Sequence, residues 1–262
     1  DNFTRKVGYD YYYGMNEYNN KKDYDGNWGI FDEPFLQYCV KQIDTLTKPF
    51  HATFFTLSSH HPYAMPEEHK NKFSKGTLIV HETVSYTDYA LKRFFNEASK
   101  CDWFENTLFL ITSDHSGLTE SKDFKTQLGL FKIPMIIYHP KMKSNIVSTQ
   151  FVQQIDVYPT IIDMLNIENE KIFTFGRSPF SEKEKYYIYY TNGEYLLMIG
   201  NYLSKYKQDG TIELFDVEKD QTLKNNIANQ QQEITKKHIR FTQAFIQQYN
   251  NTIIENTTTI SK

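Results

Sequence analysis

The stretch that most constrains the fold is residues 108–117, Leu-Phe-Leu-Ile-Thr-Ser-Asp-His-Ser-Gly. Residues 108–111 are apolar and predict a strand buried on both faces, as in the sheets of α/β proteins. Asp114 and His115 follow this strand. Ligands of α/β sheets bind at the carboxyl ends of the strands, where a carboxylate oxygen beside an imidazole nitrogen forms half of a divalent-metal site. The dipeptide alone also fits a capping aspartate beside a surface histidine.

A second predicted strand, residues 50–57, ends in the same way, because it runs into Ser-Ser-His-His-Pro-Tyr at residues 58–63. A helix is predicted between the two strands, over residues 75–95. Its apolar face is formed by Val84, Leu91, Phe94, Phe95 and Ala98. The strands of a strand–helix–strand unit are parallel and lie near each other. We therefore expect His60 to lie close to Asp114 and His115.

Two helices and one more strand complete this part of the prediction. Asp32-Glu33-Pro34 predicts the start of a helix, because acidic residues and proline are favoured in the first turn. Residues 133–138 predict a third strand, and residues 151–165 predict a further helix. Together these elements predict an α/β fold with a mostly parallel sheet between helices.

The pattern changes after about residue 175. Asn192-Gly193 and Asp209-Gly210 each separate two β-rich runs, which is a strong signal for a hairpin. The sequence thus predicts a small antiparallel sheet, followed by a helix over residues 231–249. We expect three parts, namely an α/β domain (1–175), a sheet-and-helix subdomain (176–250) and a flexible tail (251–262).

The charge balance excludes some classes of partner. The 262 residues include 29 basic and 32 acidic side chains, a formal net charge of -3, which gives no general attraction to nucleic acid or anionic membranes. The sequence contains no signal peptide and no run of 18 apolar residues. Cys39 and Cys101 fit no metal motif, so we expect two buried free thiols, although a disulfide stays open. The chain begins at Asp1 within apparently folded sequence, so we expect it to be a piece of a longer protein.

Several short motifs occur in an order that resembles a known family. They are Gly8-Tyr9-Asp10, Trp28-Gly29-Ile30, Thr-Leu-Ser-Ser-His-His-Pro-Tyr (56–63), Tyr-Thr-Asp-Tyr-Ala-Leu (86–91), Asn106-Thr107, Ser-Asp-His-Ser-Gly (113–117), Ile-Asp-Val-Tyr-Pro-Thr (155–160) and Leu-Phe-Asp-Val-Glu-Lys-Asp (214–220). Together they resemble the sulfatase-like phosphoglycerol transferases of the alkaline phosphatase superfamily, of the lipoteichoic acid synthase type. The matches span nearly the whole chain and are specific as an ordered set.

The resemblance implies roles for three residues, and a fourth candidate lies beside one of them. Asp114 and His115 match the metal-ligating Asp-His of the family, and the implied cofactor is a divalent ion (Mn, Mg, Ca or Zn). His60 matches a histidine that contacts the substrate phosphate or acts on the leaving group, and its neighbour His61 would lie at the mouth of the cleft or serve the structure. A divalent ion neutralises charge on a phosphoryl or sulfuryl group. An imidazole, which titrates near neutral pH, can give a proton to a departing alkoxide.

Part of the family's machinery has no counterpart in this sequence. The nucleophile of the family, a threonine or a modified cysteine or serine, lies well upstream of the region that matches. A further acidic metal ligand lies upstream of that nucleophile. Cys39 and Cys101 lack the Cys-x-Pro-x-Arg context of sulfatases. We therefore expect these 262 residues alone to be inactive.

Three functions stay open at this stage. The leading prediction is the carboxyl-terminal part of a metal-dependent enzyme that transfers phosphoglycerol, or hydrolyses a phosphate or sulfate ester, through a covalent threonine intermediate. The alternatives are a plain sulfatase and a non-catalytic binding domain of the same fold. The resemblance also implies an anionic ester substrate and an extracytoplasmic, membrane-anchored parent protein. Exposed sheet edges would allow the chain to pair with itself.

Overall fold

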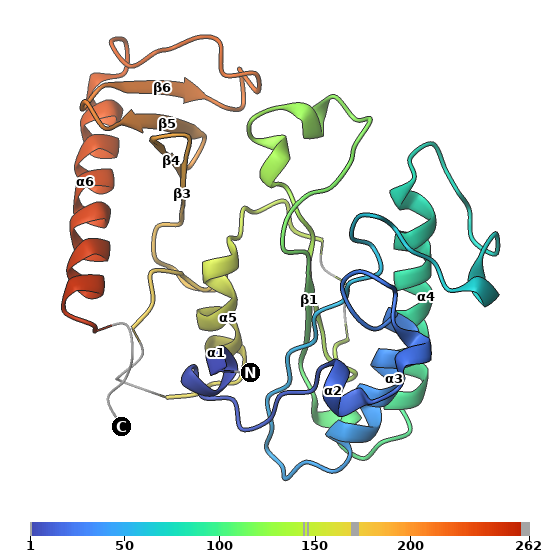
Figure 1. Ribbon diagram of the computed structural model, residues 1–262. Coiled ribbons are helices and arrows are strands. Elements are labelled where there is room, and N and C mark those ends of the chain that lie inside the picture. The colour runs from blue at the N-terminus through green and yellow to red at the C-terminus, as the bar shows by residue number, and fades with distance from the viewer. Residues whose placement is uncertain (1, 144, 146, 169–172, 258–262) are drawn as a thin grey trace. The chain divides into compact units, whose positions relative to one another are not determined.

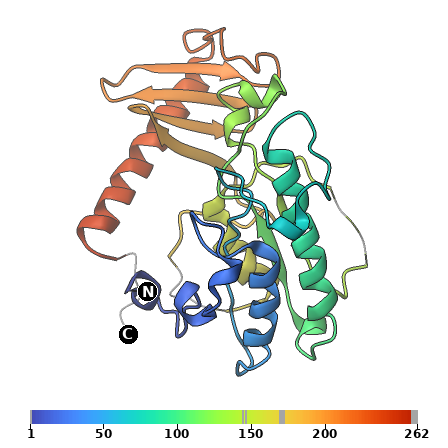
Figure 2. The ribbon, with the colours of Figure 1, turned by 45° about the vertical axis from the view of Figure 1, so that its right-hand side comes forward.

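The computed structural model describes residues 2–143, 145, 147–168 and 173–257. The chain folds into two compact units, of which unit 1 comprises residues 1–125 and 129–145, and unit 2 comprises residues 126–128 and 146–262. Figures 1 and 2 show the elements of each unit. Short 3-10 turns connect several of them, at Lys21–Asp23, Glu67–His69, Phe104–Asn106, Asp123–Lys125, Gly129–Phe131 and Gln154–Asp156.

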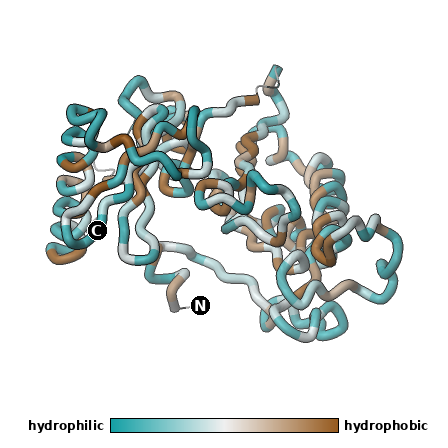
Figure 3. Tube along the Cα trace, turned by 90° about the horizontal axis from the view of Figure 1, so that it is seen from above, coloured by the Kyte–Doolittle hydropathy of each residue, from teal (hydrophilic) through white to brown (hydrophobic). Residues whose placement is uncertain are grey.

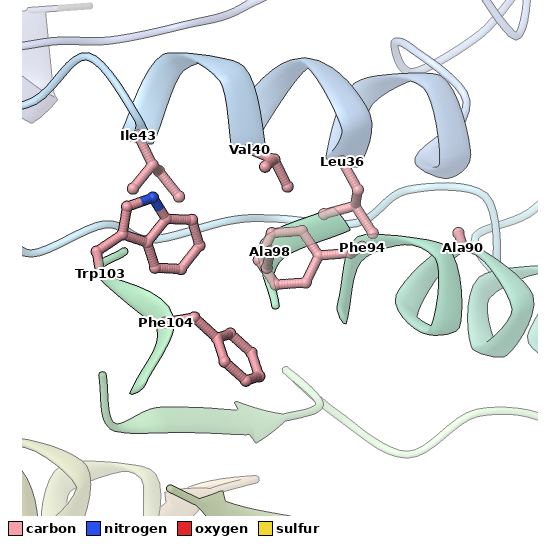
Figure 4. Close-up of a cluster of buried hydrophobic side chains, with 8 residues drawn as sticks. All are labelled: Leu36, Val40, Ile43, Ala90, Phe94, Ala98, Trp103 and Phe104. Atoms are coloured by element: carbon pink, nitrogen blue, oxygen red, sulfur yellow. The ribbon is translucent and has the colours of Figure 1, made fainter. Parts of the chain in front are cut away.

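Two helices, α3 (Asp32–Ile43) and α4 (Val80–Ala98), form the core of unit 1. The predicted start of α3 at Asp32 is confirmed. Figure 4 shows the side chains of α3 pointing at those of α4 and of the turn that follows it. The buried cluster consists of Leu36, Val40, Ile43, Ala90, Phe94, Ala98, Trp103 and Phe104. Two short helices, α1 (Asn2–Lys6) and α2 (Met15–Tyr18), precede this pair along the chain.

The helix α4 begins later than predicted, and its buried face is partly different. Phe94 and Ala98 are buried as expected, but Val84 is half exposed, and Tyr86 and Ala90 are fully buried in its place. Helical spacing alone leaves the exact direction of the buried face open within about one residue. The tube in Figure 3 shows that the helices carry both hydrophobic and hydrophilic residues around their turns, as expected for helices buried on one side only.

The sheet of unit 1 differs from the predicted parallel one. Strand β1 (Phe109–Thr112) pairs with β2 (Met135–Tyr138), and the pairing is antiparallel, with Phe109 opposite Tyr138. Both strands were expected close to these positions. The burial of β1 is partial, because its first three residues are half-buried and Thr112 is exposed. A strand buried on both faces is therefore a wrong prediction for the described residues.

Residues 50–57 do not form a strand, which is the second correction to the predicted sheet. The segment is extended, and the side chains of Phe50, Ala52 and Phe54 pack against the helical core while the residues between them are exposed. A strand also needs a neighbouring chain for its backbone N–H and C=O groups, and within the described residues this segment has no such ladder. The apolar alternation correctly predicted an extended path for this segment. It also predicted a strand, which is wrong because no neighbouring segment pairs with it among the described residues.

Unit 2 contains the antiparallel sheet that the sequence predicts. Its strand order is β3 (Tyr186–Thr191), β4 (Glu194–Ile199), β5 (Tyr202–Lys207) and β6 (Ile212–Asp216). Both expected hairpin turns are confirmed. The first turn needs left-handed backbone at Asn192 (φ 51°) and Gly193 (φ 82°), a conformation that asparagine and glycine tolerate best.

Within the described residues, unit 2 also contains two α-helices. Helix α6 (Gln232–Ile254) lies along the sheet and contacts β4, β5 and β6 (Figure 1). It extends five residues beyond the predicted end and so includes the first part of the expected tail, whose residues 258–262 lie outside the described residues. Helix α5 (Val157–Met164) is shorter than the helix predicted over 151–165. None of the helices in the described ranges is long and apolar enough to span a bilayer.

Both cysteines are free thiols, as expected, but only Cys39 is buried, because Cys101 is partly exposed. Cys39 is buried in α3, and burial raises the pKa of its thiol to about 12. Burial is also the main cause that raises the pKa of the Cys101 thiol. Neither cysteine is therefore an activated thiolate.

The buried His238 of α6 predicts a pH dependence of stability. Its Nδ1 lies 2.9 Å from the hydroxyl of Ser204, and burial lowers the pKa of the imidazole to about 4. The unfolded chain therefore gains a proton below about pH 6.5 that the folded chain does not take up until about pH 4. We expect the free energy of unfolding to fall by about 2 kcal/mol between pH 7 and pH 5.

Urea denaturation at several pH values, followed by circular dichroism, measures this dependence. His238→Gln removes the titrating group and should show a flatter pH dependence than the unaltered chain. An NMR titration of the His238 ring with a midpoint near 6.5 would contradict the expectation.

Candidate functional site

The predicted histidine pair lies in a tight turn at the end of the extended segment 50–57. The N–H of His60 donates to the carbonyl of Leu57 at 3.0 Å, and the N–H of Tyr63 donates to the carbonyl of His60 at 2.8 Å. These two hydrogen bonds hold the turn on both sides of the histidines. His60 and His61 are exposed, so both rings are accessible to a ligand.

The ring of His60 is held in one tautomer. Its Nδ1 lies 2.8 Å from the carbonyl oxygen of His61, and because a carbonyl only accepts, Nδ1 carries the hydrogen. The neutral ring then presents an unprotonated Nε2, which makes no hydrogen bond within the described residues. The structure thus leaves Nε2 as the atom that can accept or give a proton.

Trp28 is the partner of His60 that the sequence did not identify. Its ring centroid lies 4.2 Å from that of His60, and its Nε1–H donates to the carbonyl of His61 at 2.7 Å. The same carbonyl oxygen therefore accepts from both rings. Trp28 remains 56% exposed, so a large apolar surface lies beside the free nitrogen of His60.

A short loop presents Trp28 to the histidines. One carboxylate oxygen of Asp25 accepts the N–H groups of Asn27, Trp28 and Gly29 at 2.8, 2.8 and 3.0 Å. Gly26 takes a φ of 85°, and a Cβ on Gly29 would lie 2.8 Å from the side chain of Leu57. Asp25-Gly26-Asn27 is a turn signal that the sequence shows. The sequence does not show that Trp28 in this loop contacts His61, which lies 33 residues later.

Asp114 and His115 lie in the loop that follows β1, and both are exposed. The N–H of His115 donates to Asp114 Oδ1 at 2.8 Å, and His115 Nδ1 donates to the carbonyl of Ser116 at 2.7 Å. The hydroxyl of Ser116 donates in turn to the carbonyl of Leu130. These contacts fix the loop and the ring, and they leave His115 Nε2 with a free lone pair.

The geometry of this pair fits one divalent cation. His115 Nε2 and Asp114 Oδ2 are 3.5 Å apart. An ion with bonds of about 2.0–2.2 Å to nitrogen and oxygen places two tetrahedral ligands roughly 3.4 Å apart. The Nδ1–H that donates to a carbonyl is the usual second interaction of a metal-binding histidine. Asp114 Oδ2 and His115 Nε2 therefore lie at the separation that two ligands of one cation require.

The described residues supply no more than this half of a site. They contain no group of three or more His, Cys, Asp or Glu side chains arranged to hold a metal ion. The ring of His60 contacts that of Trp28, and the ring of His61 contacts that of Tyr63. Unit 1 thus holds two candidate pairs, a histidine pair covered by Trp28 and an Asp–His pair that fits a cation.

Comparisons with known proteins show which sequences this chain resembles. A family model described as Sulfatase matches residues 1–167. Lipoteichoic acid synthase 1 of Bacillus subtilis (strain 168) is 27% identical over 213 residues, which cover 75% of this chain and 33% of that protein. The lipoteichoic acid synthase of Staphylococcus aureus (strain USA300) is 24% identical, with the same two coverages. The chain thus spans about a third of the length of these relatives.

A solved structure supports the same fold. The protein of the alkaline phosphatase superfamily from Vibrio parahaemolyticus superposes with a TM-score of 0.66 at 20% sequence identity. The superposition covers 79% of this chain and 52% of that one. Because the family model covers more than half of the chain, this protein belongs to the sulfatase family.

Proposed function

We propose that these residues form the carboxyl-terminal part of the catalytic domain of a metal-dependent phosphoglycerol transferase. The observation that carries the proposal is the Asp114–His115 pair, in which Asp114 Oδ2 and His115 Nε2 are 3.5 Å apart. The similarity to lipoteichoic acid synthase 1 over 75% of the chain supports the choice of phosphoglycerol as the group that is transferred.

The proposed metal ligands are Asp114 Oδ2 and His115 Nε2. A bound Mn, Mg, Ca or Zn ion would neutralise charge on the phosphoryl group and lower the pKa of a coordinated hydroxyl. The remaining ligands would come from outside residues 1–262, because the described residues hold no third ligand at this pair. Ser116 has a supporting role, since its carbonyl keeps the hydrogen of His115 on Nδ1.

His60 is the proposed catalytic residue. Its Nε2 would contact the phosphate and, after taking up a proton to form the imidazolium, give that proton to the leaving oxygen, because Nδ1–H is already engaged by the carbonyl of His61. His61 is a proposed substrate contact at the mouth of the site, since its exposed ring packs edge-on against Tyr63 and stays accessible. The apolar face of Trp28 would exclude water on one side of His60.

The nucleophile is proposed to be a threonine outside these residues, which forms a covalent intermediate. The alternative is a plain sulfatase, which would use the same Asp114, His115 and His60 but a modified cysteine. Neither Cys39 nor Cys101 fits that role, because neither lies in the Cys-x-Pro-x-Arg context of sulfatases. A binding domain without catalysis is the third candidate, and upstream sequence distinguishes all three.

The proposal also covers the substrate, the cellular location, the domains and the self-association of the protein. The substrate would be an anionic phosphoglycerol ester, and the parent protein would be membrane-anchored with this domain outside the cytoplasm. Residues 1–175 would carry the site residues, and residues 176–250 would form an accessory subdomain. The exposed edges of the β1–β2 sheet would allow self-association.

One prediction of the proposed function concerns metal binding. Mn²⁺ or Zn²⁺ at ten times its Kd should stabilise the protein by about 1.4 kcal/mol, which corresponds to a rise in Tm of about 3–6 °C. Asp114→Ala and His115→Ala should abolish this rise, whereas Asp88→Ala, at an exposed position of α4, should keep it.

Calorimetric titration and thermal melts measure the effect, on residues 1–262 and on the natural polypeptide that contains them. Metal-dependent stabilisation of the longer polypeptide that survives both substitutions would contradict the assignment of the ligands.

Another prediction of the proposed function concerns catalysis by His60. In the natural polypeptide, His60→Gln should lower kcat for phosphoglycerol transfer from a lipid with that headgroup by about 10²–10⁴-fold, because the general acid is lost. Metal binding should be unchanged. His51→Gln is the matched control, since His51 is an exposed histidine nine residues earlier in unit 1.

An aryl sulfate ester serves as the comparison substrate in the same assay. Faster cleavage of the sulfate ester than of the phosphoglycerol lipid would favour the sulfatase alternative. Turnover of neither substrate, with metal bound, would favour the binding domain.

A further inference from the structure

Asp32 is a buried carboxylate that the function proposed above does not use. It is the first residue of α3 and is 1% exposed. One oxygen, Oδ1, accepts the N–H groups of Leu57 and Ser58 at 2.8 and 3.0 Å. The other oxygen, Oδ2, accepts the hydroxyl of Thr87 at 2.7 Å. One side chain thus joins the start of α3, the end of the extended segment and the helix α4.

The contact between Asp32 and the extended segment is reciprocal. The backbone N–H of Asp32 donates to the hydroxyl of Ser58 at 3.0 Å, and Ser58 is only 3% exposed. Two successive backbone N–H groups converge on a single oxygen of Asp32, and few backbone conformations allow such convergence. The carboxylate therefore fixes the path of the chain at Leu57 and Ser58.

No cation explains the burial of this charge. Within the described residues Asp32 forms no ion pair, and its charge is balanced by three hydrogen-bond donors and the amino-terminal end of α3. Burying a carboxylate is costly unless it is fully hydrogen-bonded. A neutral residue could hold the helices together at a lower cost, so the carboxylate is better explained by what it holds in place.

The chain that Asp32 holds leads directly to His60. The carbonyl of Leu57 accepts the N–H of His60 at 3.0 Å, so the fixed residue and the histidine share one turn. Four residues before Asp32, Trp28 covers the ring of the same histidine. The short segment from Trp28 to Asp32 therefore contacts both the ring of His60 and the backbone that carries it.

We infer that Asp32 is a positioning residue for His60. Its carboxylate fixes the backbone of Leu57 and Ser58 and thereby sets where the free Nε2 of His60 points. The inference rests on the proposed role of His60 for its effect on catalysis, but its structural part can be measured without any activity.

Substitutions on the two sides of the carboxylate separate positioning from general stability. Asp32→Ala removes the acceptor for both N–H groups of the turn. Thr87→Val removes only the donor to Oδ2, on the side of α4, and leaves the turn bonded. Asp32→Asn should preserve the network, because the amide oxygen can accept both N–H groups while the NH₂ group donates to the hydroxyl of Thr87.

Kinetics on the natural polypeptide provide the first measurement. We expect Asp32→Ala to lower kcat by about 10²-fold with little change in KM, because a displaced catalytic group loses rate rather than affinity. Asp32→Asn should retain kcat within an order of magnitude. Thr87→Val should lower Tm but keep kcat. Loss of kcat in Thr87→Val as large as in Asp32→Ala would overturn the inference.

Amide hydrogen exchange on residues 1–262 provides the second measurement. The N–H groups of Leu57, Ser58 and His60 should exchange faster in Asp32→Ala, while those in the middle of α4 should not change. Unchanged exchange at these three amides would overturn the inference, whatever the kinetics show. If His60→Gln leaves kcat intact while exchange responds as expected, the proposed function fails and the positioning stands.

Asp32→Ser covers the case in which Asp32→Ala does not fold. Serine is favoured at helix starts, but its side chain is one carbon shorter, so its hydroxyl does not reach the position of Oδ1 that accepts both bonds from the turn. It should show the same faster exchange at Leu57 and Ser58. Slow exchange at these amides in a folded Asp32→Ser protein would count against the inference.

Discussion

The carboxylate of Asp32 is the contact on which the arrangement of unit 1 depends. Its two oxygens bind groups from two segments that are more than 20 residues away along the chain, and it sits at the start of the helix that supplies three of the eight residues of the buried cluster. A buried carboxylate tolerates few alternative arrangements, because each lost hydrogen bond leaves a charge without a partner. The packing of α3 on α4 supplies the stability, and the carboxylate selects the geometry of the turn that carries His60.

The two candidate pairs share one local hydrogen-bonding pattern. In both His60 and His115, Nδ1–H donates to the carbonyl of the following residue, and Nε2 is left free. The hydrogen bond fixes the tautomer without a second charged residue. For His115 a fixed tautomer suits a metal ligand, and for His60 it suits a group that exchanges a proton at Nε2. The same backbone interaction therefore prepares two histidines for different proposed tasks.

The sequence was most informative where local chemistry decides the structure. The start of α3 at Asp32 and the hairpins at Asn192-Gly193 and Asp209-Gly210 follow from side chains that satisfy nearby backbone groups or tolerate a left-handed turn. Asp114 and His115 were also predicted as metal ligands from the sequence, because they are adjacent and follow a strand, and this role stays a prediction. The resemblance to the sulfatase-like phosphoglycerol transferases was confirmed at the level of the family.

The tertiary structure decided what depends on partners far away along the chain. Residues 50–57 have the composition of a strand, but a strand exists only where another chain segment satisfies its backbone, and within the described residues β1 pairs with β2 instead. The sequence likewise gave no sign that Trp28 would cover His60 or that Asp32 would bind Leu57 and Ser58. The sequence alone determined the family and predicted the residue types of the candidate site. Only the folded chain determined how the turn that carries His60 is held, because the hydrogen bonds from Leu57 and Ser58 to Asp32 join segments that are 25 and 26 residues apart along the chain.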